Sequence, residues 1–179
     1  MFKRIAMVLL VVCALAPVAN AQFVPVLDNF SLTLGAGTSI PARSEAFTSG
    51  YEPAFYRVIL VEYKFNDWLR TFGKWDRSIF DAQIDGDGSQ IDLMGWGVGM
   101  MLMAPVLPKW SLYGKVAYEN TTLEGVTDQW SPQTALGINY AVSPNADGRV
   151  EVGFKTYSAS ELIESFTIHG AVNFHKAAQ

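Results

Sequence analysis

The sequence contains a single cysteine, Cys13, which lies in the apolar stretch near the N-terminus. Once that stretch is set aside, the chain has no disulfide and no thiolate ligand for a metal. Its fold must therefore be held by packing, hydrogen bonds and charge alone.

Basic residues are few and do not cluster. Lys and Arg number 13 against 17 Asp and Glu, and two of the 13, Lys3 and Arg4, precede the apolar stretch, which leaves 11 against 17. Nucleic-acid binding needs stripes of Lys and Arg to meet phosphates, so this acidic chain is not expected to bind nucleic acid. Peripheral attachment to anionic lipid by charge is unexpected for the same reason.

Long apolar runs are also missing, although 50% of the residues are apolar and 13% are aromatic. Beyond residue 21, the most apolar segment is 93–107, and it is interrupted by glycines and prolines. A helix needs about 20 apolar residues to cross a bilayer, so no transmembrane helix is expected. The apolar side chains must either fill a soluble core or face lipid from strands.

The N-terminus has the order of a secretory signal peptide. Lys3 and Arg4 precede an apolar run over residues 5–17, and Ala19-Asn20-Ala21 follows. This pattern predicts cleavage between Ala21 and Gln22. Val12, before Cys13, is not the small residue that lipoprotein processing needs. We therefore expect a cleaved signal peptide over residues 1–21 and one exported domain over residues 22–179.

Apolar residues recur with a period of two, which predicts strands. In 110–118, for example, Trp110, Leu112, Val116 and Tyr118 share one parity. The register of 55–65 stays open because Val58 to Val61 is apolar on both faces. Eight strands are expected, near residues 30–36, 55–65, 69–80, 93–104, 110–119, 135–142, 149–157 and 166–175.

The connections between these strands alternate in length. Short turns are expected at 66–67, 107–109 and 143–148, and longer links at 40–52, 81–90, 120–130 and 158–163. Short turns on one rim and longer loops on the other are typical of outer-membrane barrels. Aromatic residues near the strand ends predict two membrane-interface belts. The short-turn belt is Tyr63, Phe65, Trp68, Trp110, Tyr140 and Phe174, and the loop belt is Tyr51, Phe55, Phe80, Tyr118, Trp130, Tyr157 and Phe166.

The alternating strands, the loop pattern and the last strand, Phe166 to Phe174, resemble the OmpA/OmpX-type family of outer-membrane proteins over the whole mature chain. The resemblance implies an all-β fold, an eight-stranded antiparallel up-and-down transmembrane β-barrel, in the outer membrane of a Gram-negative cell. Its implied partners are outer-membrane lipid, lipopolysaccharide and the assembly machinery, with no cofactor. One departure is that residues 175–179 follow Phe174, where such barrels usually end on the aromatic residue.

Charged side chains gather at the parity that faces the barrel interior. An eight-stranded barrel is just wide enough to be filled by its own side chains, so unpaired charges there would be costly and ion pairs across strands are expected. A narrow ion path is the alternative. The predicted network is Arg70, Lys74, Asp76, Lys115, Glu119, Arg149, Glu151, Lys155 and His169, with Glu62 and Arg57 as further candidates.

Two residues match a catalytic pattern in part. Ser158 and Glu164 resemble the serine and glutamate of the lipid A deacylase barrels, but Thr156 stands at the position of the histidine. Without an imidazole, nothing obvious removes the serine proton, and His169 lies further from the loop rim. We therefore expect no enzyme activity.

The segment 81–92 resembles half of a calcium-binding loop. Asp85, Asp87 and Asp92 offer carboxylate oxygens at turn positions. Position twelve, counted from Asp85, is Trp96 instead of the bidentate glutamate. A solvated acidic turn, without metal, is the expectation.

The sequence thus predicts a non-catalytic barrel with a structural role or a surface-interaction role through the loops 40–52, 81–90 and 120–130. One alternative is an acyl hydrolase acting on lipid A from the same barrel. Another is a soluble periplasmic barrel of lipocalin type that binds an apolar ligand. That reading requires charges outside, whereas Lys115, Glu151 and Lys155 share a parity with small residues.

Overall fold

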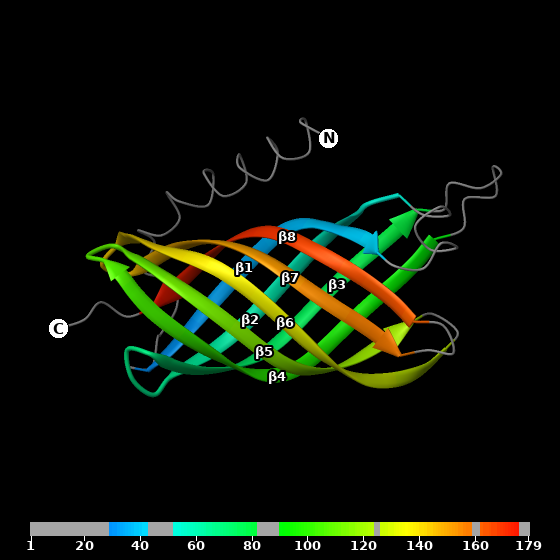
Figure 1. Cartoon of the computed structure of the whole chain (residues 1–179), viewed down its shortest axis with the longest axis horizontal. Coiled ribbons are helices and arrows are strands. Elements are labelled where there is room, and N and C mark those ends of the chain that lie inside the picture. The colour runs from blue at the N-terminus through cyan, green and yellow to red at the C-terminus, as the bar shows by residue number, and fades with distance from the viewer. Residues whose placement is uncertain (1–28, 43–51, 82–89, 124–125, 159–161, 176–179) are drawn as a thin grey trace.

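The chain forms a closed barrel of eight antiparallel strands, as predicted (Figure 1). The computed structural model describes residues 29–42, 52–81, 90–123, 126–158 and 162–175. Each strand pairs with its neighbours in the chain, and the first strand pairs with the last, from Ser31 opposite His175 to Ala42 opposite Glu164. The strands are β1 (Phe30–Ala42), β2 (Ala54–Lys64), β3 (Leu69–Asp81), β4 (Gln90–Leu107), β5 (Trp110–Leu123), β6 (Val126–Ser143), β7 (Ala146–Ser158) and β8 (Leu162–His175).

The short turns lie together at one end of the barrel, with the start of β1 and the end of β8 (Figure 1). In the β2–β3 turn, the side-chain oxygen of Asn66 accepts hydrogen bonds from the backbone N–H groups of Trp68 and Leu69, at 3.0 and 2.8 Å. Such a side-chain bond replaces a backbone bond in a tight turn. Only Pro144 and Asn145 separate β6 from β7. The predicted alternation of short and long connections is therefore confirmed for the first half of the chain, where 43–53 and 82–89 are long. In the second half, 124–125 and 159–161 are as short as the turns at the other end, and the β6–β7 turn is tighter than the expected 143–148.

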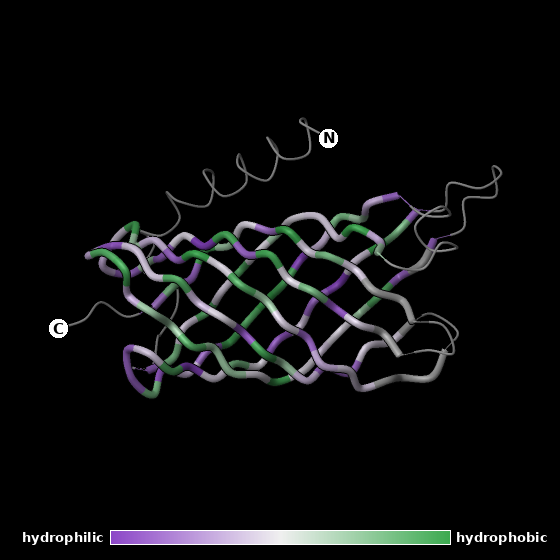
Figure 2. The backbone as a smooth tube through the Cα atoms, viewed as in Figure 1, coloured by the Kyte–Doolittle hydropathy of each residue, from purple (hydrophilic) through white to green (hydrophobic). Residues whose placement is uncertain are grey.

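Side chains alternate between the interior and the outer surface, and most strands carry both apolar and polar residues along their length (Figure 2). In β2, Val58 and Leu60 are buried, whereas Ile59 is 41% exposed. This register places Glu62 inside and Arg57 outside. Arg57 is therefore not part of the interior network, and the expectation for it was wrong. The sequence left the register open because apolar residues occupy both faces of this strand.

The expected loop 120–130 is mostly a strand hairpin. β5 continues to Leu123 and β6 begins at Val126, with Asn120 opposite Trp130 and Thr121 opposite Gln129. The polar composition suggested a loop, but the backbone hydrogen bonds of a hairpin do not require apolar side chains. β1 likewise extends past the predicted end at residue 36 to Ala42, where Pro41 is paired with β8 and no longer with β2. Proline fits there because it has no N–H to donate to a second neighbour.

Aromatic side chains form the two predicted belts on the outer surface, with one exception. Phe80 is fully buried and points inward, since it shares the parity of Asp76 and Ser78 on β3. Tyr51 and the side chain of Tyr157 lie outside the described residues. Ring pairs near the short turns are Phe30–Tyr63, Tyr63–Phe65 and Trp110–Tyr140, and those toward the loops are Trp96–Trp130, Tyr118–Trp130 and Phe154–Phe166.

The signal peptide and two of the predicted loops fall on residues that the structure does not describe. The signal peptide, residues 1–21, and the loop segments 43–51 and 82–89 lie outside the described residues. Within the residues that are described, no helix is long and apolar enough to cross a membrane.

Candidate functional site

Charged side chains inside the barrel form three contiguous clusters, the first of which lies nearest the short turns. In this Glu62 cluster, Arg149 binds the Glu62 carboxylate through both terminal nitrogens, one of them at 3.0 Å. Arg70 approaches the same carboxylate at 3.3 Å, and Thr33 donates a hydrogen bond to it at 2.6 Å. The Nε of Arg149 donates to Asn139 at 2.9 Å. The guanidinium and the carboxylate are thus both held by several bonds, as a buried ion pair requires.

The second cluster surrounds Glu151, further along β7. The Nζ of Lys115 lies 2.7 Å from the Glu151 carboxylate, and the Tyr113 hydroxyl donates to the same group at 3.0 Å. The Nε2 of His169 lies 3.7 Å from it. Lys115 also lies over the Phe72 ring, 5.5 Å from its centre, within the range of a cation–π contact.

The third cluster, around Asp76, lies toward the loop rim and alternates in charge. Lys74 contacts Asp76 at 2.6 Å and also binds Glu119. Lys155 binds Asp76 and lies 3.3 Å from Glu119. The Tyr56 hydroxyl donates to Asp76 at 3.2 Å. Two cations and two carboxylates therefore neutralise one another around one closed circuit of contacts.

These clusters lie across the lumen, with contacts between side chains of several strands. The cavity that lies between the Glu151 and Asp76 clusters has a volume of about 20 Å³, which is room for about one water molecule. An apolar layer packs against these clusters, and its Tyr56, Tyr113 and Phe72 contact them directly. Its members are Tyr56, Val58, Leu60, Phe72, Met101, Met103 and Tyr113. Ion pairs and apolar packing therefore both occupy the interior of the described barrel.

The structure brings all nine residues of the predicted network inside, together with Glu62. Sequence reasoning missed their neutral partners, of which Tyr56, Tyr113, Thr33 and Asn139 carry hydrogen bonds. Parity could have found the two tyrosines, because Tyr56 has the parity of Glu62 on β2 and Tyr113 has that of Lys115 on β5. No inward charge among the described residues of β1 or β6 marks Thr33 or Asn139 in this way. The tyrosines resemble core residues in sequence, and their polar tips become visible only when the facing strands are placed.

The two residues of the partial catalytic pattern lie at the loop end of β7 and β8. Ser158 is the last residue of β7 and is paired with Leu162, while Glu164 is paired with Thr156. Nothing is described of the side chains of Ser158 and Glu164. His169 is buried in the Glu151 cluster, opposite residue 151, which is seven positions from Ser158 along β7 and about 23 Å away at 3.3 Å per residue. The structure therefore does not bring His169 to Ser158.

The metal candidates are divided between described and undescribed parts of the chain. Asp85 and Asp87 lie outside the described residues. Asp92, on β4, accepts hydrogen bonds from the Nε of Arg77 at 2.9 and 3.0 Å. In the described part of the chain, no group of three or more acidic, histidine or cysteine side chains could hold a metal ion.

Comparison with known proteins finds similarity in structure only. No protein-family model matches the chain, and no curated protein matches it in sequence. The solved Neisserial surface protein A aligns with a TM-score of 0.60 at 16% identity, over 81% of this chain and 96% of that protein. The outer membrane protein OprG of Pseudomonas aeruginosa aligns with 0.55 at 12% identity, over 84% and 97%.

A third neighbour is Ail, the attachment invasion locus protein of Yersinia pestis, solved in complex with the heparin analogue sucrose octasulfate. It aligns with a TM-score of 0.54 at 13% identity, over 83% of this chain and 100% of that protein. All three neighbours are small outer-membrane β-barrels. This chain therefore has the fold of the OmpA/OmpX-type small outer-membrane barrels.

Proposed function

We propose that this chain is an integral outer-membrane protein that acts structurally, or through binding at its long-loop rim, and not as a catalyst. The observation that supports the proposal is which side chains face outward and which face the interior of the barrel. Outward residues in the middle of the wall are apolar and exposed, such as Val98 at 65% and Leu136 at 72%, while the buried interior carries ion pairs. A soluble barrel of lipocalin type would need the reverse arrangement.

The loop rim is the surface left for interaction. In bacterial barrels the short turns are periplasmic and the longer loops extracellular. The longer connections of this chain contain segments 43–51 and 82–89, and β5 and β6 extend to Leu123 and from Val126 at the same end of the barrel. Loops on a rigid wall can vary without loss of the fold, so specific binding belongs on this rim.

The absence of catalysis is supported by the position of the only nearby imidazole candidate. His169 is enclosed by Glu151 and Tyr56, with its ring centre 5.1 Å from that of Tyr56. A serine nucleophile needs a base within hydrogen-bond reach. A barrel that relies on Ser158 would have to recruit a base from elsewhere.

Fractionation of cells that express the full-length chain tests the membrane assignment. We expect the protein in the outer-membrane fraction, with a gel band that shifts after boiling, because a folded barrel migrates differently from the unfolded chain. A single unshifted band in the soluble periplasm would overturn the proposal. A Ser158→Ala variant tests the non-catalytic assignment in the same cells, where lipid A acylation should equal that of the wild type. Acylation that depends on Ser158 would show a hydrolase instead.

A further inference from the structure

Two arginines lie on the outer surface of the wall directly opposite each other. Arg57 on β2 is paired with Arg77 on β3, and both have the outward parity of their strands. Opposed residues of an antiparallel pair have Cβ atoms about 4.5–5.5 Å apart, so like charges there destabilise the sheet. Arg77 is bound to Asp92. Among the described residues, Arg57 has no ion pair within 4 Å, although Asp92 lies close enough to interact with it electrostatically. The three groups together keep a net positive charge.

The arginine pair lies at the level of the loop-side aromatic belt. On β2, one outward neighbour of Arg57 is the exposed Phe55, and on β3, one outward neighbour of Arg77 is Trp75. Trp75 is paired with Trp96, whose ring packs against that of Trp130. An arginine facing lipid costs about 2–4 kcal/mol at the bilayer midplane and about 0–1 near the interface. The pair is therefore tolerated in the headgroup layer, where phosphates lie.

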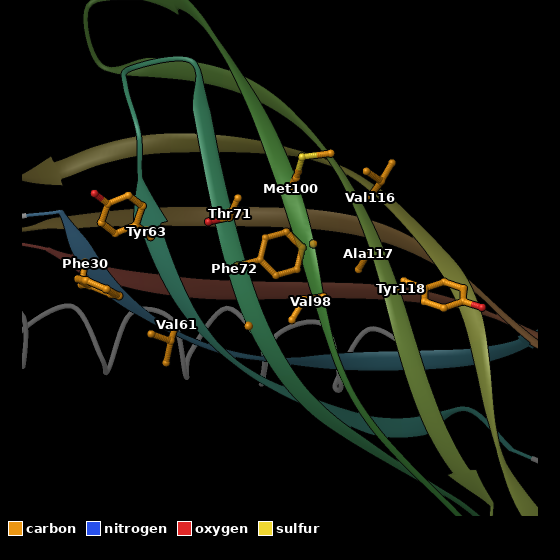
Figure 3. Close-up of a pocket in the computed structure, with 12 residues that line it drawn as sticks. Phe30, Val61, Tyr63, Thr71, Phe72, Val98, Met100, Val116, Ala117 and Tyr118 are labelled. Carbon is orange, nitrogen blue, oxygen red and sulfur yellow. The ribbon is translucent and has the colours of Figure 1, made fainter.

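An apolar groove is lined by residues of the same two strands and their neighbours (Figure 3). Its floor is at Gly73, which is paired with Val61, two outward positions from Arg77. A Cβ added at Gly73 would meet no atom within 4 Å. The groove has a volume of about 790 Å³, and Val61, Tyr63, Val98, Met100 and Tyr118 are among its lining residues. The distance from Arg77 to Gly73 is about 13 Å along the strand at 3.3 Å per residue, which suits the upper part of an acyl chain.

We propose that Arg57 and Arg77, with the groove at Gly73, bind one lipopolysaccharide molecule of the outer leaflet. A lipid phosphate lies between the two guanidinium groups and relieves their repulsion, since arginine binds phosphate through paired hydrogen bonds. An acyl chain then passes Ile59 and Trp75 into the groove. The assignment rests on the proposed function, because that function places the loop rim on the outer side of the membrane.

The test is the affinity of the purified barrel, in detergent micelles, for lipopolysaccharide. We expect the Arg57→Gln, Arg77→Gln double variant to bind about tenfold more weakly or worse, the change that loss of one charge-assisted bond produces. Arg57→Gln alone, which keeps the Arg77–Asp92 pair intact, should weaken binding in the same direction. Gly73→Leu should also weaken binding, because its side chain would occupy the groove.

Matched controls distinguish binding at this site from general effects of positive charge and side-chain size. The Lys64→Gln, Lys109→Gln double variant removes two positive charges at the short-turn end and should leave the affinity unchanged. Gly114→Leu adds the same bulk at another outward glycine, where the nearest atom to an added Cβ is 3.6 Å away. Gly114 lines a neighbouring groove that has only Met100 and Val116 in common with the groove at Gly73. This variant should bind as the wild type. A band that still shifts on boiling shows that each variant is folded.

Two further probes identify the ligand chemistry. Lipopolysaccharide stripped of phosphate should bind about tenfold more weakly, and inorganic phosphate alone should not compete at equal concentration. The inference is overturned if the arginine variants bind as the wild type, if the lysine control loses as much affinity, or if Gly73→Leu and Gly114→Leu do not differ. In those cases an outer-membrane location of the wild type would leave the proposed function standing, whereas a soluble wild type would remove both.

Discussion

At the residue scale, the interior depends on a few side chains that each satisfy several partners. Glu62 is fully buried, forms ion pairs with Arg149 and Arg70, and accepts a hydrogen bond from Thr33. Removal of one member of a buried ion pair leaves the other charge without compensation, and this costs more than the pair gains. Glu62 is therefore the residue whose substitution should destabilise the short-turn end of the barrel most.

We expect Glu62→Ala to destabilise the barrel by about 3–5 kcal/mol, because the buried Arg149 and the partly buried Arg70 lose their counter-charge. Urea unfolding in micelles, followed by tryptophan fluorescence, measures the change. Asp67→Asn is the control, since it removes a carboxylate from the exposed Lys64–Asp67 pair in the adjacent turn, and exposed pairs contribute little. Equal unfolding midpoints for Glu62→Ala and the wild type would show that the Glu62 cluster does not stabilise the fold.

At the scale of the strand, glycines have opposite roles according to the face they occupy. Gly37, on β1, faces inward where the first and last strands meet, and a Cβ there would overlap the backbone carbonyl oxygen of Ile168. A backbone atom cannot move aside without breaking the pairing. Gly73, on the outer face of β3, has open space instead. Sequence alone cannot separate these two cases, because both glycines lie in alternating segments.

Gly37→Ala should therefore destabilise the barrel, and Gly73→Ala should leave it unchanged or stabilise it by about 0.5–1 kcal/mol, the usual cost of glycine in a strand. The temperature at which the heat-shifted band appears measures both effects. The pair of variants is matched in chemistry and differs only in the space around the new methyl group. The explanation fails if both variants shift the temperature by the same amount.

At the scale of the whole molecule, the barrel is closed laterally and filled along its axis. The β1–β8 pairing joins the ends of the described chain, so the strands form one ring without an open edge. The three charged clusters and the apolar layer fill the ring. A narrow ion path, the alternative considered from the sequence, would need a continuous aqueous passage through these contacts.

We expect the barrel to show no steady conductance in planar bilayers, because the clusters cross the lumen from several strands. A general porin in the same bilayer serves as the positive control. A voltage-proportional current from this protein alone would mean that the ion pairs line a path instead of closing it.

What the sequence by itself determined is the periodic part of the structure. The alternation of apolar residues in 110–118 and 149–157 predicted strands and their faces, and Pro108 and Asn66 marked short turns, because these features act over neighbouring residues. Residues of one parity in a strand point to the same face, so parity also identified the charged residues of the interior. Where both parities were apolar, as at Val58 to Val61, this signal was absent.

Only the tertiary structure decided which side chains meet. The register of β2 places Glu62 inside and Arg57 outside, and ring closure brings Arg149 to Glu62, 87 positions away in the chain. It also aligns Arg57 with Arg77 on two strands that line the groove at Gly73. Parity determines the face of a residue, but the partner depends on strand register and tilt, which are properties of the closed barrel as a whole.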